Sequence, residues 1–162
     1  MSIKEGDSLP EATVIRNGAE GPETVSISAL TKGRKVVIFG LPGAFTGTCT
    51  TAHVPSFMRT KEAFAAKGVE DIICLSVNDP FVMGAWSDAT GAGAAGITMV
   101  GDAESEFTKA IGMDFSAPPV GLIGRSKRYA MMVDDGVVKV LHIDENPGVC
   151  ETSAGEAMLD AI

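Results

Sequence analysis

Short apolar runs alternate along this chain with stretches in which apolar residues recur at helical spacing. Residues 35–40, 71–77 and 98–100 form apolar runs of the kind that fits buried strands. Residues 50–67 carry apolar positions near one face of a helix, and residues 80–89 also have helical character. This alternation predicts strands and helices that follow one another around a shared sheet.

The C-terminal third adds a hairpin to the alternation. Apolar runs at 129–133 and 137–141 flank the sequence Asp-Asp-Gly at 134–136, and Asp and Gly tolerate the positive φ that tight turns require. Helices are expected before the hairpin, at 104–111, and after it, at 153–162. The order predicts an α/β fold, a mixed sheet with helices on both faces. A thioredoxin-like arrangement satisfies this order, which by itself leaves other α/β sandwiches open.

The composition is that of a globular protein of one domain. The 162 residues are 45% apolar and 21% charged, and no repeat or linker divides residues 1–162. A net charge of −8 gives the chain no electrostatic reason to bind nucleic acid or anionic lipid, so neither is expected as a partner. The first ten residues lack a basic region followed by an apolar run, and no apolar stretch is long enough to span a bilayer. We therefore expect a cytoplasmic protein.

The three cysteines, Cys49, Cys74 and Cys150, are odd in number and far apart in the sequence. Such a set is a poor framework for structural disulfides and favours reactive or buried thiols. Cys74 lies inside an apolar run, where a buried, inert thiol is the simplest interpretation. Cys49 has a different setting, because it follows a strand and a Pro-Gly turn and comes at the start of a helix.

That position favours a reactive thiolate at Cys49. The first N–H groups of a helix lack intrahelical partners and the helix dipole is positive there, so an anionic sulfur is stabilised. Thr46 can direct its hydroxyl at the sulfur or at a ligand, and Pro42 can wall the pocket against water. A cysteine used as apolar filler is the alternative, but Cys49 lies between threonines and not in an apolar run. The residues alone therefore favour reactivity without naming a substrate.

The sequence around Cys49 is similar to that of a known family. Pro42, a threonine four residues later and a cysteine three residues after that resemble the peroxiredoxin signature. The wider Pro-Gly-Ala-Phe-Thr, Thr-Cys and His-Val-Pro sequences resemble its type II (atypical two-cysteine) subfamily, which has a thioredoxin-like fold. The similarity continues at 76–83, with Trp86, and at 128–130 and 135–138, so that it covers nearly the whole chain.

The resemblance implies roles for four residues. Cys49 is the peroxidatic cysteine, Thr46 the hydrogen-bonding hydroxyl, Pro42 the shield, and Arg128 the guanidinium beside the sulfur. An arginine suits this role because it stays protonated and its planar donors can meet both sulfur and peroxide oxygen. The product is a sulfenic acid. One departure is Gly47, where many members have proline, and it is expected to loosen the loop and to alter how easily the active-site helix unwinds.

Three further residues carry alternatives. His53 follows Cys49 by four residues, which would suit a nucleophile and base, but we interpret it as supporting the pocket by hydrogen bonding. The resemblance makes two cysteines candidates for the resolving thiol: plant-like members have one at the strand position of Cys74, and vertebrate-type members have one near Cys150. We favour Cys150 and leave open that neither acts, because an external thiol can reduce the sulfenate directly.

The sequence thus predicts a thiol peroxidase that reduces hydrogen peroxide and organic hydroperoxides through Cys49. The expected reductants are glutaredoxin with glutathione, or thioredoxin, and the expected roles are antioxidant defence and redox homeostasis. No metal and no organic cofactor is expected. The resemblance also implies a homodimer that packs along the active-site edge. Two alternatives stay open: a Cys–His acyl transferase or hydrolase, and a redox sensor or holdase without sustained turnover.

Overall fold

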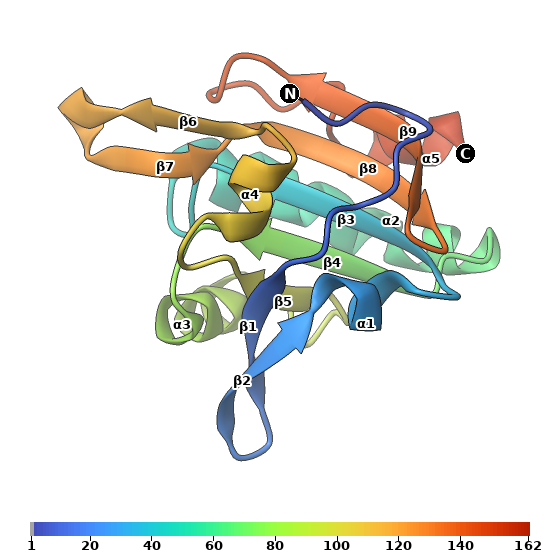
Figure 1. Cartoon of the computed structure of the whole chain (residues 1–162), viewed down its shortest axis with the longest axis horizontal. Helices are drawn as coiled ribbons and strands as arrows, with labels where there is room; N and C mark the ends of the chain where they lie inside the picture. The colour runs from blue at the N-terminus through green and yellow to red at the C-terminus, as the bar shows by residue number, and fades with distance from the viewer. Residues whose placement is uncertain (1) are drawn as a thin grey trace.

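The computed structural model describes residues 2–162, which form a seven-stranded mixed sheet with helices on both faces (Figure 1). The strands follow the spatial order β2-β1-β5-β4-β3-β8-β9. The central β3, β4 and β5 are parallel, whereas β1 and β8 flank them in the antiparallel sense. The predicted α/β class and mixed sheet are confirmed. The strands of this sheet are β1 (Thr13–Gly18), β2 (Gly21–Ser26), β3 (Lys35–Leu41), β4 (Asp71–Ser76), β5 (Thr98–Gly101), β8 (Arg128–Asp134) and β9 (Val137–Asp144).

The helices cover the sheet in two layers. In Figure 1, α1 and α4 lie on the near face, and α2, α3 and α5 lie behind the sheet. A separate two-stranded arm, β6 with β7, projects beside α4. None of the helices within residues 2–162 has the length and apolar character needed to cross a membrane. The elements are α1 (Ile27–Thr31), the π-helical η1 (Cys49–His53), α2 (Val54–Ala66), α3 (Pro80–Thr90), α4 (Glu106–Ala110), β6 (Asp114–Ala117), the 3-10 helix η2 (Pro118–Val120), β7 (Leu122–Ser126) and α5 (Gly155–Ala161).

The central strands are continuous apolar runs because they are buried on both faces. Along β3, Val36 and Ile38 face the layer of α1 and α4, while Val37 and Phe39 face the layer of α2, α3 and α5. Each layer therefore has its own apolar cluster, and the sheet is shared between them. The single domain expected over residues 1–162 stays a prediction.

The predicted central elements are confirmed within a few residues at their ends, and the hairpin has the expected turn. Asp134 pairs with Val137, and Asp135 and Gly136 both have positive φ, as a two-residue hairpin loop requires. Three parts of the fold were not predicted: the β1–β2 hairpin, the short α1 and the β6–β7 arm. Each is short or edge-exposed, so its residues lack a long apolar run or a repeated helical spacing.

The N-terminal segment runs along the free edge of β9. Gly6 N–H donates to the Val138 carbonyl at 2.8 Å, and Val138 N–H donates to the Asp7 carbonyl at 2.9 Å. Farther along the strand, Leu141 N–H donates to the Glu5 carboxylate at 3.1 Å. The backbone groups of β9 that point away from β8 are therefore engaged at these positions.

Candidate active site

Cys49 lies where the chain leaves the central strand β3 and enters a helix. Helical backbone begins at Gly47, and residues Cys49–His53 form a π-helical turn in which Val54 N–H donates to the Cys49 carbonyl. The continuous helix predicted over 50–67 is thus a π-helical turn followed by the α-helix Val54–Ala66. The reason is Pro55, which has no N–H and would crowd the carbonyl four residues earlier in a regular α-helix. The wider turn accommodates it.

Arg128, the first residue of β8, contacts the sulfur of Cys49. Its Nη2 donates to Sγ at 3.1 Å and to the Pro147 carbonyl at 2.8 Å, while its Nη1 lies 3.0 Å from Nδ1 of His53. Cys49 and Arg128 are 0% and 1% exposed. Within residues 2–162 the guanidinium makes no ion pair, and its buried Nε has no hydrogen-bond partner. The Arg128 charge is therefore available to an anion at the sulfur.

His53 is buried and its two ring nitrogens have defined roles. Nε2 lies 3.1 Å from the Ser153 carbonyl, which can only accept, so Nε2 carries the proton. Nδ1 is then a lone pair that accepts from Arg128. Burial, followed by the charge of Arg128, lowers the pKa of His53 to about 3. The imidazole is accordingly neutral, and it supports Arg128 without a hydrogen bond to Sγ among the described residues.

Thr46 and Pro42 lie in the loop before Cys49, but neither makes a hydrogen bond to the sulfur. The Thr46 hydroxyl donates to the Gly43 carbonyl at 2.7 Å. Pro42 is buried at the end of β3, and its carbonyl accepts from Arg125 Nη1 at 3.1 Å. Arg125 packs so closely on the loop that a Cβ on Gly43 would overlap its guanidinium.

The π-helical turn is also fixed from the side by α3. The indole N–H of the buried Trp86 donates to the Thr50 hydroxyl at 3.0 Å. Thr50 directly follows Cys49, so this bond ties the active-site turn to the helix behind the sheet. The chain has one tryptophan.

A loop from Glu145 to Ser153 closes the other side of the site, and Asp144 organises it. The Asp144 carboxylate accepts hydrogen bonds from the backbone or side chains of Glu151, Thr152 and Ser153. Burial alone would raise the pKa of Asp144, but the hydrogen bonds led by those of Ser153 lower it to about 2. Sequence reasoning did not find this residue, because its partners lie seven to nine positions later and form no local motif.

The other two cysteines differ in their access to the site. Cys74 is fully buried in β4, and burial, reinforced by the nearby Cys49, raises the pKa of its thiol well above the usual range. Cys150 is half-buried in the Glu145–Ser153 loop, and its pKa is raised by burial while Arg128 opposes that shift. All three thiols are free. The loop that carries Cys150 is tied to the active-site turn, because the Thr48 hydroxyl donates to the Gly148 carbonyl at 2.9 Å.

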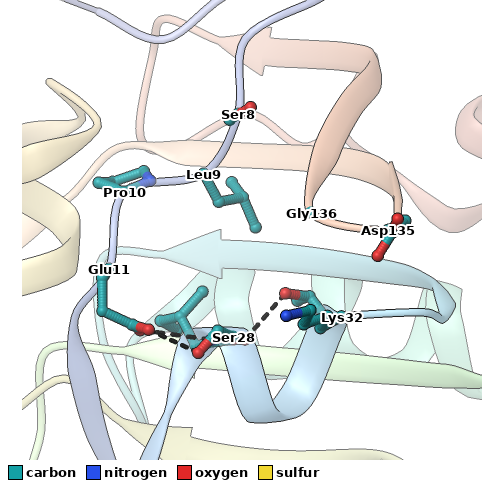
Figure 2. A pocket seen from close by; sticks show the side chains of 10 residues that line it. Ser8, Leu9, Pro10, Glu11, Ser28, Lys32, Asp135 and Gly136 are labelled. Carbon is teal, nitrogen blue, oxygen red and sulfur yellow. Dashed lines mark hydrogen bonds between the residues drawn. The ribbon is translucent and has the colours of Figure 1, made fainter.

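The cavity seen in Figure 2 is distinct from this site. It has a volume of about 300 Å³ and lies between the N-terminal segment, α1 and the β8–β9 turn, where Leu9 points inward with Glu11 and Asp135 on either side. The turn adjoins the first residue of β3, whereas Cys49 follows the last. This cavity is therefore at the opposite end of the central strand from the reactive sulfur.

Known proteins share both the sequence and the structure of this chain. The Redoxin family model matches residues 4–159. Peroxiredoxin-2E-2, chloroplastic, of Oryza sativa subsp. japonica is 47% identical over 165 residues, which span 99% of this chain and 73% of the relative. Peroxiredoxin-2D of Arabidopsis thaliana is 38% identical over 161 residues, 99% of this chain and 98% of the relative. The crystal structure of reduced Prx3 in complex with H2O2 from Vibrio vulnificus has a TM-score of 0.91 and 41% identity, and covers 98% of both chains.

The thioredoxin-like sheet and the buried cysteine at a strand–helix junction define a redoxin. Within that class the chain belongs to the peroxiredoxin family, and its relatives are the type 2 peroxiredoxins. Peroxiredoxins are thiol peroxidases, so the protein is an oxidoreductase that reduces hydroperoxides. The predicted family, fold and enzyme class are confirmed.

Proposed function

We propose that Cys49 is the nucleophile of this peroxidase and that Arg128 stabilises the charge that develops in its reaction. The observation that carries the proposal is the 3.1 Å contact between Arg128 Nη2 and Cys49 Sγ in a buried site. The thiolate sulfur attacks one peroxide oxygen, an S–O bond forms as the O–O bond breaks, and the leaving oxygen takes a proton to become water or an alcohol. Cys49 becomes a sulfenic acid.

Arg128 suits this step because its charge has no carboxylate partner within residues 2–162. Its donors pair with the thiolate before attack and with the departing oxygen as negative charge moves onto it. A fixed donor that meets charge in the transition state lowers the barrier more than one that binds both states equally. We assign Pro42 as a shield and Thr46 as a polar group of the substrate pocket, in keeping with their places in the loop.

The geometry of His53 disfavours the hydrolase alternative. A Cys–His acyl transferase needs an imidazole that removes the proton of the thiol. Here both ring nitrogens of His53 are committed, one to the Ser153 carbonyl and the other to Arg128. We propose that His53 instead supports Arg128.

The sulfenic acid must return to a thiol, and we propose that Cys150 is the preferred resolving residue of the chain. This proposal is supported by the position of Cys150, which lies half-buried in a loop beside Arg128, whereas Cys74 is fully buried in a central strand. The Thr48–Gly148 and Arg128–Pro147 hydrogen bonds tie the loop that carries Cys150 to the active site. Glutaredoxin with glutathione, or thioredoxin, would then supply the electrons, either to that disulfide or to the sulfenic acid directly.

We also propose a homodimer that forms along the active-site edge. The large apolar side chains that are exposed come from segments around this edge: Phe45 from the loop before Cys49, Phe81 from the start of α3, and Val120 and Ile123 from the β6–β7 arm. Phe45 has a φ of 63°, an unfavourable conformation for a residue other than glycine. A second copy is the partner that such an apolar surface and the family resemblance favour.

A cytoplasmic location stays a prediction, because relatives whose names state a compartment are chloroplastic or mitochondrial.

The peroxidase assignment of residues is tested by hydrogen peroxide consumption with excess dithiothreitol. Cys49→Ser is expected to abolish turnover. Arg128→Lys keeps a charge but loses the forked donors, and is expected to lower kcat by about 100-fold or more. Arg59→Lys is the matched control, because Arg59 is an exposed arginine paired with Glu156 and is expected to behave as wild type. Normal turnover in Cys49→Ser would refute the assignment.

Intact-mass measurement after one equivalent of peroxide tests the resolving thiol. Loss of two hydrogens that persists in Cys74→Ser and vanishes in Cys150→Ser is the expected result. A stable gain of one oxygen in the wild type would argue for reduction by an external thiol. The sensor alternative predicts one such oxidation event but no sustained peroxide consumption with any of the reductants.

A further inference from the structure

Arg128 and Asp144 are direct cross-strand neighbours, yet their charges are not paired. The β8–β9 register sets one opposite the other, and the two residues are only 1% and 7% exposed. Opposite charges at such positions attract. Among the ion pairs within residues 2–162, however, none joins them. The two groups have separate sets of partners.

The Asp144 carboxylate is fully occupied by the loop that follows β9. One oxygen accepts from the backbone N–H and hydroxyl of Thr152, at 3.1 and 2.8 Å. The other accepts from Glu151 N–H at 3.0 Å and from the N–H and hydroxyl of Ser153, at 3.0 and 2.6 Å. These donors balance the negative charge. Asp144 therefore leaves the positive charge of Arg128 uncompensated.

The same contacts connect Asp144 to the sulfur through a chain of hydrogen bonds. Holding Ser153 fixes the carbonyl that accepts the Nε2 proton of His53. That bond selects the tautomer in which Nδ1 of His53 accepts from Arg128 Nη1. The other terminal nitrogen of Arg128 is then directed at Cys49 Sγ. The tautomer protonated at Nδ1 would place an N–H group against the guanidinium N–H of Arg128, and this series of hydrogen bonds would be interrupted.

We propose that Asp144 is a positioning residue for peroxide reduction, acting through Ser153 and His53 to hold Arg128 against Cys49. Its own carboxylate stays hydrogen-bonded to the loop after β9 and forms no ion pair with Arg128. The inference rests on the proposed function of Cys49 and Arg128. Asp144 does not touch the reacting atoms, so its contribution is to geometry. Misplacement of a catalytic group by about 1 Å can slow a reaction about 100-fold.

The test is the second-order rate constant for oxidation of Cys49 by hydrogen peroxide, measured in a single turnover of the full chain. Asp144→Asn keeps the size of the side chain but replaces one acceptor oxygen with a donor. It is expected to lower the rate constant about ten- to a hundred-fold, and Asp144→Glu is expected to recover part of the loss. Ser153→Ala, which removes only one hydrogen bond to Asp144, should show a smaller loss in the same direction if Asp144→Asn folds poorly.

Two measurements separate positioning from loss of stability. Nitrogen-15 NMR of the His53 ring should show protonated Nε2 in the wild type and a mixture of tautomers in Asp144→Asn. Asp102→Asn is the matched control, because Asp102 is also buried and accepts from two backbone N–H groups and the Thr108 hydroxyl, but next to α4 on the other face of the sheet. It should lose stability without a change in the His53 tautomer or in the rate constant.

A wild-type rate constant and an unchanged tautomer in Asp144→Asn would overturn the inference and leave the proposed function intact. An equal loss in Asp102→Asn would also overturn it, since general destabilisation would then explain the effect. If the wild type itself showed no peroxide reduction dependent on Cys49, the proposed function would fail, and the inference with it.

Discussion

At the scale of single residues, the feature that requires explanation is the buried charge of Arg128. Burying a cation is costly unless it is paired or hydrogen-bonded. Arg128 has the neutral His53, the Pro147 carbonyl and the Cys49 sulfur as partners, and of these only the sulfur can carry a negative charge. The charge of Arg128 is therefore directed at the sulfur, with no competing carboxylate paired to it within residues 2–162.

His53 gives this arrangement a dependence on pH. Its pKa is near 6.5 when unfolded and about 3 when folded, so the unfolded chain binds the extra proton between those values. The contribution of His53 to the free energy of unfolding is expected to be fully present above pH 6.5. It should decrease as the pH falls below that value, by up to about 1.4 kcal/mol per pH unit. Urea denaturation at pH 7 and pH 4.5 measures this loss.

The comparison protein for this measurement is His53→Gln, which should lose less stability over the same interval. Asp144, with a folded pKa of about 2, contributes stability that is lost only below its ordinary value of 3.8, and so lies outside this window. The same pH dependence in His53→Gln and in the wild type would show that other groups are responsible.

The residues of the site were predictable to different degrees. Cys49, Thr46 and Pro42 lie in one short segment, and Arg128 lies in a second one that the family resemblance identifies. Asp144 could not be found in this way, because its partners lie seven to nine positions later and form no local motif. Arg125 could not be found either, because its partner Pro42 is distant in the sequence and is reached only through the folded arm.

At the scale of elements, the helix that carries Cys49 has two parts with different constraints. The π-helical turn is tied to α3 by the Trp86–Thr50 hydrogen bond and is followed by Pro55 in the first turn of α2. Gly47, two residues before Cys49, has no side chain, and a Cβ there would meet open space. Gly47 therefore adds backbone freedom at the point where unwinding of the turn would begin.

Gly47→Pro is expected to stabilise the protein by about 0.4–1 kcal/mol, because proline restricts the unfolded chain and fits the first position of a helix. It should also slow the reaction of oxidised Cys49 with glutathione, since the turn opens less readily. Thermal unfolding and mass spectrometry of the mixed disulfide measure the two effects. Gly47→Ala, which does not fix φ, should have the smaller effect on both; a lower Tm in the proline variant would contradict the prediction.

The elements that sequence reasoning missed share a physical cause. The parallel strands are buried on both faces and appear as apolar runs, whereas β2 and β6 expose much of their length and carry polar residues. The β6–β7 arm is fixed by contacts with distant residues, such as that of Arg125 with Pro42. The local pattern of apolar and polar residues gives no sign of such contacts.

At the scale of the whole molecule, the apolar surface at the active-site edge leads to a prediction about assembly. Ile123 is 64% exposed on β7, and if the proposed dimer forms through this surface we expect Ile123→Glu to give a monomer, because a buried charge at the interface is unfavourable. Light scattering coupled to size exclusion measures the mass. Thr24→Glu places the same charge on an exposed residue of β2, an edge strand of the seven-stranded sheet, and should leave the mass as in the wild type. Equal masses for both variants and the wild type would argue against this surface as the dimer interface.

The N-terminal segment that borders β9 has a consequence for the fate of the protein at high concentration. An open edge strand is a template on which another chain can add, and stacking of this kind leads to aggregation and amyloid. Here the backbone groups of Val138 are already satisfied by Gly6 and Asp7, and the Leu141 amide by Glu5. These two amides should exchange slowly with deuterium although they lie on an outer strand. A strand from another molecule could therefore pair with β9 at these positions only after the N-terminal segment had detached.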